Sequence, residues 1–121
     1  MVDVPQPEAG KAVVVGRLFS TTNGDPLVNV VVRLAEVYYP EDTPDDKEKG
    51  IYVLDNAFSP SATTDEQGIF VFINVEARDY VIFVGDLAIK YAIVLGPEGK
   101  AKIWTIKPDE INDLGNIRVD Y

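Results

Sequence analysis

The stretch TTDEQGIFVFINV, residues 63–75, decides the fold. Asp65 to Gly68 has the composition of a turn, and the run from Ile69 to Val75 is apolar at nearly every position. Its β-branched and aromatic residues favour a strand. Because successive side chains of a strand point to opposite faces, a strand lying on one core needs an apolar residue only at every second position. We therefore expect a β protein in which this strand meets apolar partners on both faces.

Other segments of the chain have the same character. Valine-rich or alternating runs separated by Gly, Pro, Asn and Asp predict about eight strands in all, the further ones being residues 11–19, 28–39, 51–54, 80–84, 87–95, 100–107 and 117–121. Residues 80–84 are predicted to be the antiparallel neighbour of residues 69–75. No stretch has a helical period with caps, and residues 107–115 could hold at most one short helical turn. An antiparallel sandwich or barrel follows, since parallel strands would need crossover helices.

Length and composition predict the domain organisation. The chain has 121 residues, of which 46% are hydrophobic, which is enough for one domain with its own core. Residues 1–10 contain two prolines and a glycine and are predicted to be a flexible lead-in. Residues 11–121 are predicted to form a single β-sandwich domain.

The charge balance bears on the partners. The net charge is −9 at pH 7, which would repel phosphate backbones and anionic lipid surfaces, so we expect no nucleic-acid partner. No run of about 18 apolar residues could span a membrane, and we expect no direct membrane insertion. No signal peptide is visible at the N-terminus. The chain contains no cysteine, so its redox compartment cannot be inferred.

Two runs carry a resemblance to a known family: GRLFSTTNGDPLVNVVVRL, residues 16–34, and TTDEQGIFVFINVEARDYVIFV, residues 63–84. They resemble the signature runs of carboxypeptidase regulatory-like domains, which have the transthyretin-like, or prealbumin-like, sandwich. The first run matches by a glycine, a Gly-x-Pro-Leu turn and an alternating strand: Gly16, Gly24, Pro26, Leu27, Val30, Val32 and Leu34. The second matches by a Thr-Asp-x-x-Gly turn, an aromatic strand and a tyrosine: Thr64, Asp65, Gly68, Phe70, Phe72, Val75 and Tyr80. DLGNIRV, residues 113–119, is similar to the closing strand of many such domains.

The resemblance implies an antiparallel Greek-key sandwich of transthyretin-like topology, with about seven to nine strands. It also implies an accessory, non-enzymatic module beside catalytic, adhesive, transport or anchor domains of exported bacterial proteins. This chain departs from the family pattern at Asn29 and Arg78, where glycine is common. Residues 35–62 are a longer connection than usual, and residues 86–107 look like an added hairpin.

The residue content argues against catalysis. There is no histidine, which removes His-based triads, His-ligated zinc and the commonest general base near neutral pH. The absence also separates the chain from the hydroxyisourate hydrolases and intradiol dioxygenases, which have related sandwiches and use histidine. Ser20, Ser59 and Ser61 lie in turn-like contexts. We expect no catalytic residue, no cofactor, and a protein that is not an enzyme.

Two further chemical alternatives remain open. Carboxylates could hold calcium through oxygen ligands, and the candidates are Asp65 and Glu66 in the turn together with Asp42, Asp45 and Asp46 in the acidic segment. Their spacing lacks the order of an EF-hand loop, so a turn and a solvated loop are the favoured interpretations. Lys11 and Asn116, near the first and last strands, are a candidate pair for an intramolecular isopeptide bond of the kind found in adhesin sandwiches.

Tyr38, Tyr39 and Tyr52 flank the acidic segment 40–50. Aromatic rings stack on the apolar faces of sugars, and carboxylates accept hydrogen bonds from hydroxyl groups. These tyrosines are therefore a candidate ligand rim, although packing within the protein is the favoured interpretation.

Five apolar side chains are a candidate interface: Ile69, Val71, Ile73, Val81 and Phe83. Leaving them in water would forgo several kcal/mol, at about 1.5–3 kcal/mol for each fully buried side chain. Residues 35–62 and 86–107 could cover them, or a second copy or a neighbouring domain could do so. We favour the first and expect at least three of the five to be largely buried within one chain.

The sequence thus favours a non-catalytic accessory module that spaces or docks protein domains in a bacterial envelope or extracellular protein. Its expected partners are other protein domains or a second copy. The alternative is a carbohydrate- or peptide-binding module that uses the aromatic and acidic rim.

Overall fold

The structure, a computed structural model, describes residues 4–42, 50–54, 59–86 and 88–121. Within these ranges it is all β, with no helix. The strands are β1 (Lys11–Ser20), β2 (Val31–Tyr38), β3 (Ile51–Val53), β4 (Ser61–Thr63), β5 (Ile69–Glu76), β6 (Asp79–Asp86), β7 (Lys90–Ile93), β8 (Trp104–Thr105) and β9 (Ile111–Val119).

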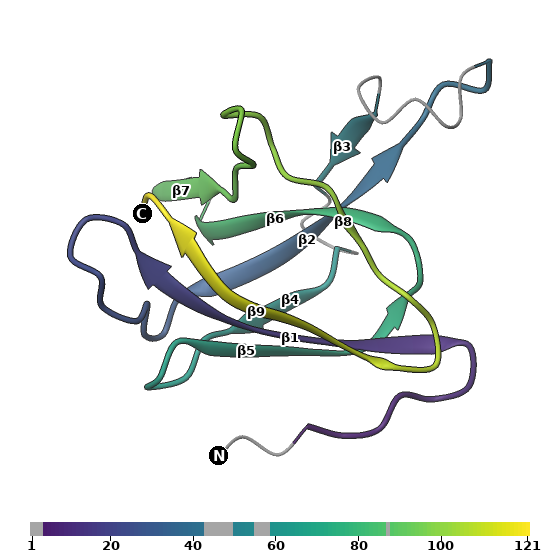
Figure 1. Ribbon diagram of the computed structural model, residues 1–121, viewed down its shortest axis with the longest axis horizontal. Helices are drawn as coiled ribbons and strands as arrows, with labels where there is room; N and C mark the ends of the chain where they lie inside the picture. Colours follow the sequence, from purple (N-terminus) through teal and green to yellow (C-terminus); the bar gives the residue numbers. More distant parts are fainter. Residues whose placement is uncertain (1–3, 43–49, 55–58, 87) are drawn as a thin grey trace.

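The strands form two sheets that lie face to face (Figure 1). One sheet has three strands in the order β5-β1-β9. The other has the order β3-β2-β6-β7, with β4 also pairing with β2 and β8 with β6. The chain crosses between the sheets after β1, β4, β5 and β8, which is the connectivity of a β-sandwich. The predicted all-β sandwich is confirmed.

The main core lies between the two sheets. Its largest side chains include Tyr80, Phe70, Leu18, Leu34 and Ile82, each no more than 1% exposed. A methyl group added at Gly16 would lie 2.6 Å from the Cζ atom of Phe70. The ring of Phe70 therefore occupies the space that any side chain at Gly16 would need, because real carbon atoms do not approach so closely.

A second, smaller cluster lies on the outer face of the larger sheet. It contains the buried residues Ala35, Val37, Val81 and Phe83. Residues from the connections pack on it: Tyr39, Leu54, Ile93, Ala101 and Ile103. Strand β6 is consequently buried from Tyr80 to Gly85 without alternation. Apolar cover on both faces is thus found for β6.

The structure corrects the predicted pairing of residues 69–75 with residues 80–84. β5 pairs with β1, whereas β6 pairs with β2, β7 and β8 in the other sheet. The short connection between them turns a corner of the sandwich instead of closing a hairpin. The five side chains of the candidate interface therefore do not share one face.

Their burial follows this division. Val81 and Phe83, on β6, are 1% and 7% exposed beneath the connections. Ile69 and Val71, on β5, are half-buried, and Ile73 is 57% exposed. The expectation that at least three of the five would be largely buried is therefore wrong: cover from within the described part of the chain is complete on β6 and only partial on β5.

The ends and partners of the last strands also differ from the prediction. β9 begins at Ile111, where a helical turn was considered, and it pairs parallel to β1. No crossover helix is needed, because almost the whole domain connects these two strands. Strand β4 was not predicted. Residues 100–107 were expected to form a hairpin with the strand before them, but β8 pairs with β6. The hairpin is therefore short and is closed by the bridge between Leu95 and Ala101.

Asn29 has a φ of 55°, the left-handed conformation for which glycine is common and which asparagine tolerates better than most residues. Outside glycine, the described residues with positive φ are Asn29, Asn74 and Asp109. The corner at Arg78 is therefore made without the left-handed conformation.

Candidate functional site

Three aromatic rings form a row on the outer face of the larger sheet: Tyr52 on β3, Phe83 on β6 and Tyr91 on β7. The ring of Tyr52 meets Phe83 edge-on, with centroids 5.8 Å apart, and Tyr91 stacks on the other side at 6.1 Å. Strand β2 lies between β3 and β6 in this sheet, and its residue Ala35 belongs to the same cluster as Phe83. Tyr52 is 42% and Tyr91 is 50% exposed. We call these three rings the aromatic row.

A groove of about 280 Å³ adjoins the aromatic row at Tyr52. Its apolar floor belongs to the second cluster, and its lining residues are Val37, Gly50, Tyr52, Val81, Glu98, Lys100, Ala101 and Ile103. A Cβ atom at Gly50 would lie 2.8 Å from side-chain atoms of both Val37 and Tyr39. The absence of a side chain at Gly50 thus lets the chain entering β3 lie close against the floor.

A tight turn brings two charged side chains to the rim of this groove. The N–H of Gly96 donates to the carbonyl oxygen of Lys100 at 2.7 Å, and the N–H of Gly99 donates to that of Gly96 at 3.1 Å. Glu98 and Lys100 are exposed and make no ion pair within the described part of the chain. The rim thus offers a carboxylate and an ammonium group that are free to bind a ligand.

The three tyrosines proposed as one rim are divided by the structure. Tyr38 and Tyr39 are adjacent and point to opposite faces of the sheet. Tyr38 donates its hydroxyl hydrogen to the carboxylate of Glu36, and the guanidinium of Arg78 lies 4.9 Å from its ring centroid. Tyr39 is half-buried in the second cluster and donates to Asp79 at 2.6 Å. Of the three, Tyr52 is the one in the groove.

From the sequence, Phe83 was a candidate for a protein interface only, and no binding role was assigned to Tyr91, Glu98 or Lys100. Tyr91 and Phe83 are eight residues apart and become neighbours because β6 and β7 pair, with Gly85 opposite Tyr91. Neither hydroxyl of Tyr52 and Tyr91 is hydrogen-bonded among the described residues. Two sequence signals were available for these residues: the alternation along residues 90–95 and the turn composition of GPEG. Both are as typical of packing within the protein as of ligand binding.

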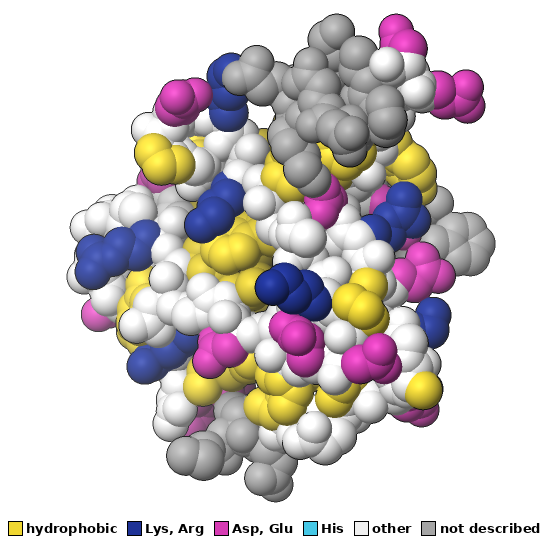
Figure 2. Space-filling view, turned by 45° about the vertical axis from the view of Figure 1, so that its right-hand side comes forward, with side chains coloured by type: hydrophobic (Ala, Val, Ile, Leu, Met, Phe, Trp, Pro, Cys, Tyr) yellow, Lys and Arg dark blue, Asp and Glu magenta, His cyan; other side chains and the backbone are white. Residues whose placement is uncertain are grey.

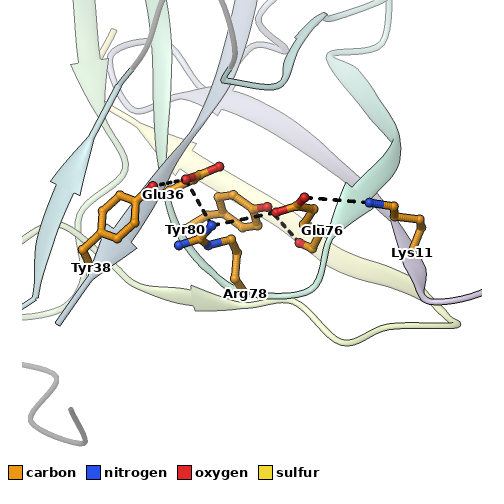
Figure 3. Close-up of polar contacts among 6 residues, drawn as sticks. All are labelled: Lys11, Glu36, Tyr38, Glu76, Arg78 and Tyr80. Carbon is orange, nitrogen blue, oxygen red and sulfur yellow. Dashed lines mark hydrogen bonds and ion pairs between the residues drawn. The ribbon is translucent and has the colours of Figure 1, made fainter. Parts of the chain in front are cut away.

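Charged groups also gather at the corner between β5 and β6, where they hold one another (Figure 3). Nη1 of Arg78 lies 3.2 Å from Glu36 and 3.8 Å from Glu76, and Nζ of Lys11 lies 3.9 Å from Glu76. The hydrogen bond to Glu36 raises the pKa of Tyr38. Burial, with the nearby Glu36 carboxylate, raises the pKa of Tyr80 to about 12. These contacts link both sheets and indicate a structural role.

The calcium candidates that the structure describes form no metal site. Oδ1 of Asp65 accepts hydrogen bonds from the N–H groups of Gln67 at 2.8 Å and Ile69 at 3.0 Å, which is how aspartate closes a turn. Glu66 and Asp42 are exposed, and Asp45 and Asp46 lie outside the described residues. Among the residues that are described, no group of three or more acidic side chains could hold a metal ion.

The candidate isopeptide pair is far apart. Asn116 pairs with Arg17 of β1, whereas Lys11 begins that strand and lies opposite Glu76. Six residues of strand separate Lys11 from Arg17, about 20 Å at a rise of about 3.3 Å per residue. This hypothesis was wrong, because a lysine side chain cannot span that distance.

The surface carries mixed charge. Figure 2 shows lysine and arginine side chains scattered among carboxylates and hydrophobic patches on the face that it presents. Within the described ranges, no helix has the length and the apolar character needed to cross a membrane.

Comparisons with known proteins place the fold. No family model matches the chain. A stretch of 68 residues is 35% identical to colossin-A of Dictyostelium discoideum; it makes up 56% of this chain and, to the nearest per cent, 0% of colossin-A. The chain thus corresponds to a very small part of that relative.

Two solved structures have similar folds. A candidate carbohydrate-binding protein of Pseudomonas aeruginosa has a TM-score of 0.50 and 18% identity, covering 96% of this chain and 99% of that one. BcpA, the major pilin subunit of Bacillus cereus, has a TM-score of 0.52 and 12% identity, covering 92% of this chain and 30% of that one. At these identities the likeness shows the fold alone. The chain is a β-sandwich domain.

Proposed function

We propose that this domain is a non-catalytic accessory module of a larger extracellular or envelope protein and that it binds its partner through the groove and the aromatic row. One observation carries the proposal: exposed rings lie beside a groove whose rim has a carboxylate and an ammonium group, and none of these polar groups is paired with another described residue. At the corner of Arg78, in contrast, the charged side chains are engaged with one another.

The family resemblance supports this proposal. The matching runs include Gly16, which lies against Phe70, and Asp65, which closes its turn. Both residues serve the sandwich itself, as an accessory module requires. The 68-residue match to a small part of a much longer protein supports a role as one module among others. The lack of histidine and cysteine supports a non-catalytic role.

Binding by the intact chain to a glycan array and to a displayed peptide library tests the proposal. We expect reproducible binding that Tyr52→Ala reduces and that Tyr38→Ala leaves unchanged, because Tyr38 lies on the opposite face of the sheet. Tyr38→Ala is the matched control, since it removes a similarly exposed ring from the neighbouring strand. Silence from both panels, with a folded protein, would contradict a binding role and leave only spacing.

Docking to a second copy is a second candidate function, favoured by the exposure of Ile73. This side chain is 57% exposed beside the half-buried Val71 and Ile69, so contact there would remove apolar surface from water. Sedimentation velocity over a concentration series tests it. Self-association that Ile73→Glu abolishes would support docking, and a monomer at every concentration would contradict it.

A further inference from the structure

The floor of the groove presents side chains and not backbone. Val37 and Val81 lie on β2 and β6, which are interior strands with a neighbour on each side. Their N–H and C=O groups are therefore used within the sheet. A peptide recognised as an added strand needs an open sheet edge with free backbone groups. The floor of this groove offers none, so a ligand that lies on the floor is held by rings and side chains.

The aromatic row offers the surface that a sugar ring needs. A pyranose ring has an apolar face of C–H groups, and an aromatic ring binds such a face by dispersion and C–H contacts while both keep their hydroxyl groups in water. Tyr52 is in the groove, and Tyr91 continues the row on the far side of Phe83. A ligand longer than one sugar could thus contact Tyr52 in the groove and extend along the row.

The rim supplies partners for hydroxyl groups. Glu98 accepts hydrogen bonds and Lys100 donates them, and neither is held by an ion pair within the described ranges. A neutral hydroxyl group can donate a hydrogen bond to Glu98 and accept one from Lys100. A carboxylate or an ammonium group of a ligand can do only one of the two. The net charge of −9 further disfavours sulfated or carboxylated chains.

We infer that the groove binds a neutral oligosaccharide, with a sugar ring stacked on Tyr52, hydroxyl groups bound by Glu98 and Lys100, and further sugars placed along the row toward Tyr91. This inference rests on the proposed function and names its ligand. The groove volume of about 280 Å³ lies just below the usual range for small-ligand sites, roughly 300–1,000 Å³. It suits one or two sugar rings, with the remainder lying on the exposed row.

Titration of the intact chain with neutral oligosaccharides tests the inference. The probes are maltose, cellobiose and chitobiose with their longer oligomers, and a heparin-derived oligosaccharide is the anionic comparison. We expect one neutral series to bind, with affinity that rises from the monosaccharide to the oligomers. Calorimetry gives the affinity, and amide chemical shifts locate the contact at β3 and the turn 96–100.

Variants distinguish stacking from loss of folding. We expect Tyr52→Ala to weaken binding about tenfold or more, which corresponds to about 1.4 kcal/mol, and Tyr52→Phe to retain most of the affinity because the ring remains. Tyr38→Ala should leave affinity unchanged. Glu98→Gln and Lys100→Gln should each weaken binding less than Tyr52→Ala, and thermal melting shows whether each variant is folded.

Three outcomes would overturn all or part of the inference, and they differ in what they mean for the proposed function. Peptides that bind in a Tyr52-dependent way, with no binding of any neutral oligosaccharide, would overturn the glycan assignment and leave the binding role intact. No binding of either class would overturn both. Preference for the heparin-derived probe would overturn the assignment of a neutral ligand alone.

Discussion

The hydroxyl group of Tyr80 donates a 2.8 Å hydrogen bond to the carbonyl oxygen of Glu76, four residues earlier. This bond closes the corner at which the chain leaves the sheet of β5 and enters the sheet of β6. The ring of Tyr80 is 1% exposed in the main core, so the same side chain anchors the corner and fills the space between the sheets. A hairpin was predicted at this point. The structure has a corner instead, and the hydroxyl group of Tyr80 holds it.

Tyr80→Phe tests the contribution of this bond. The variant keeps the ring and loses the donor, so we expect the free energy of unfolding to fall by about 1 kcal/mol, the net value of one hydrogen bond. Urea denaturation measures it. A decrease much larger than this would mean that the hydroxyl group does more than close the corner, and no decrease would mean that water replaces it without cost.

Alkaline pH should destabilise the protein through the same residue. The pKa of Tyr80 rises from 10.0 to about 12 on folding, so the folded state favours the protonated phenol. The resulting stability is fully present below pH 10 and is lost as the pH rises toward about 12. Thermal melting across this window should show a steeper loss in the wild type than in Tyr80→Phe. Parallel profiles for the two proteins would contradict the raised pKa.

Gly16→Ala should destabilise the fold by overpacking. The added methyl group would meet Cζ of Phe70 at 2.6 Å and Cε2 at 2.8 Å, and extra carbon atoms in a packed core cost about 1–3 kcal/mol. Gly96→Ala is the matched control, because its Cβ would find no atom closer than 3.7 Å. Phe70→Leu in the Gly16→Ala background should cost less than Phe70→Leu alone, since the two positions share one space.

Phe83→Ala and Ile73→Ala should differ sharply in their effect on stability. Phe83 is 7% exposed in the second cluster, whereas Ile73 is 57% exposed on β5. We expect Phe83→Ala to lower the free energy of unfolding by about 3 kcal/mol or more and Ile73→Ala to lower it by less than about 1 kcal/mol. Denaturant titration of both variants makes the comparison. Equal losses would mean that the outer faces of the two sheets are covered alike.

The intact mass should equal the mass calculated from the sequence. An isopeptide bond would release ammonia, and the separation of Lys11 from Asn116 along β1 prevents it. Mass spectrometry of the purified chain under denaturing conditions is the measurement. A mass lower by one ammonia would contradict the strand register given for β1 and β9.

Local properties of the chain were open to prediction from the sequence. Alternation and β-branching located β1, β2, β5 and β6 to within a few residues of their observed ends. The turn of residues 65–68 follows from its own composition, since Asp65 bonds to N–H groups two and four residues later. Asn29 stands where the resemblance has glycine, and it adopts the left-handed conformation that glycine would allow.

Partners distant in sequence were not predictable in this way. Residues 69–75 and 80–84 look like a hairpin, because the segment between them is short and both flanks are apolar. The competing arrangement, with β5 on β1 and β6 on β2, satisfies the same pattern and buries Phe70 and Tyr80 together between two sheets. The choice depends on contacts between residues far apart in the chain, which periodicity does not report.

The sequence by itself determined an all-β domain with two-sided apolar strands and no imidazole or thiol chemistry, because strand propensity, turn composition and residue content are local properties. Tertiary structure alone decided which strands share a sheet and which rings share a surface. Tyr38 and Tyr39, adjacent in the chain, lie on opposite faces, whereas Tyr52 and Tyr91 meet the same ring of Phe83. Only strand pairing across the sheet brings such distant side chains together.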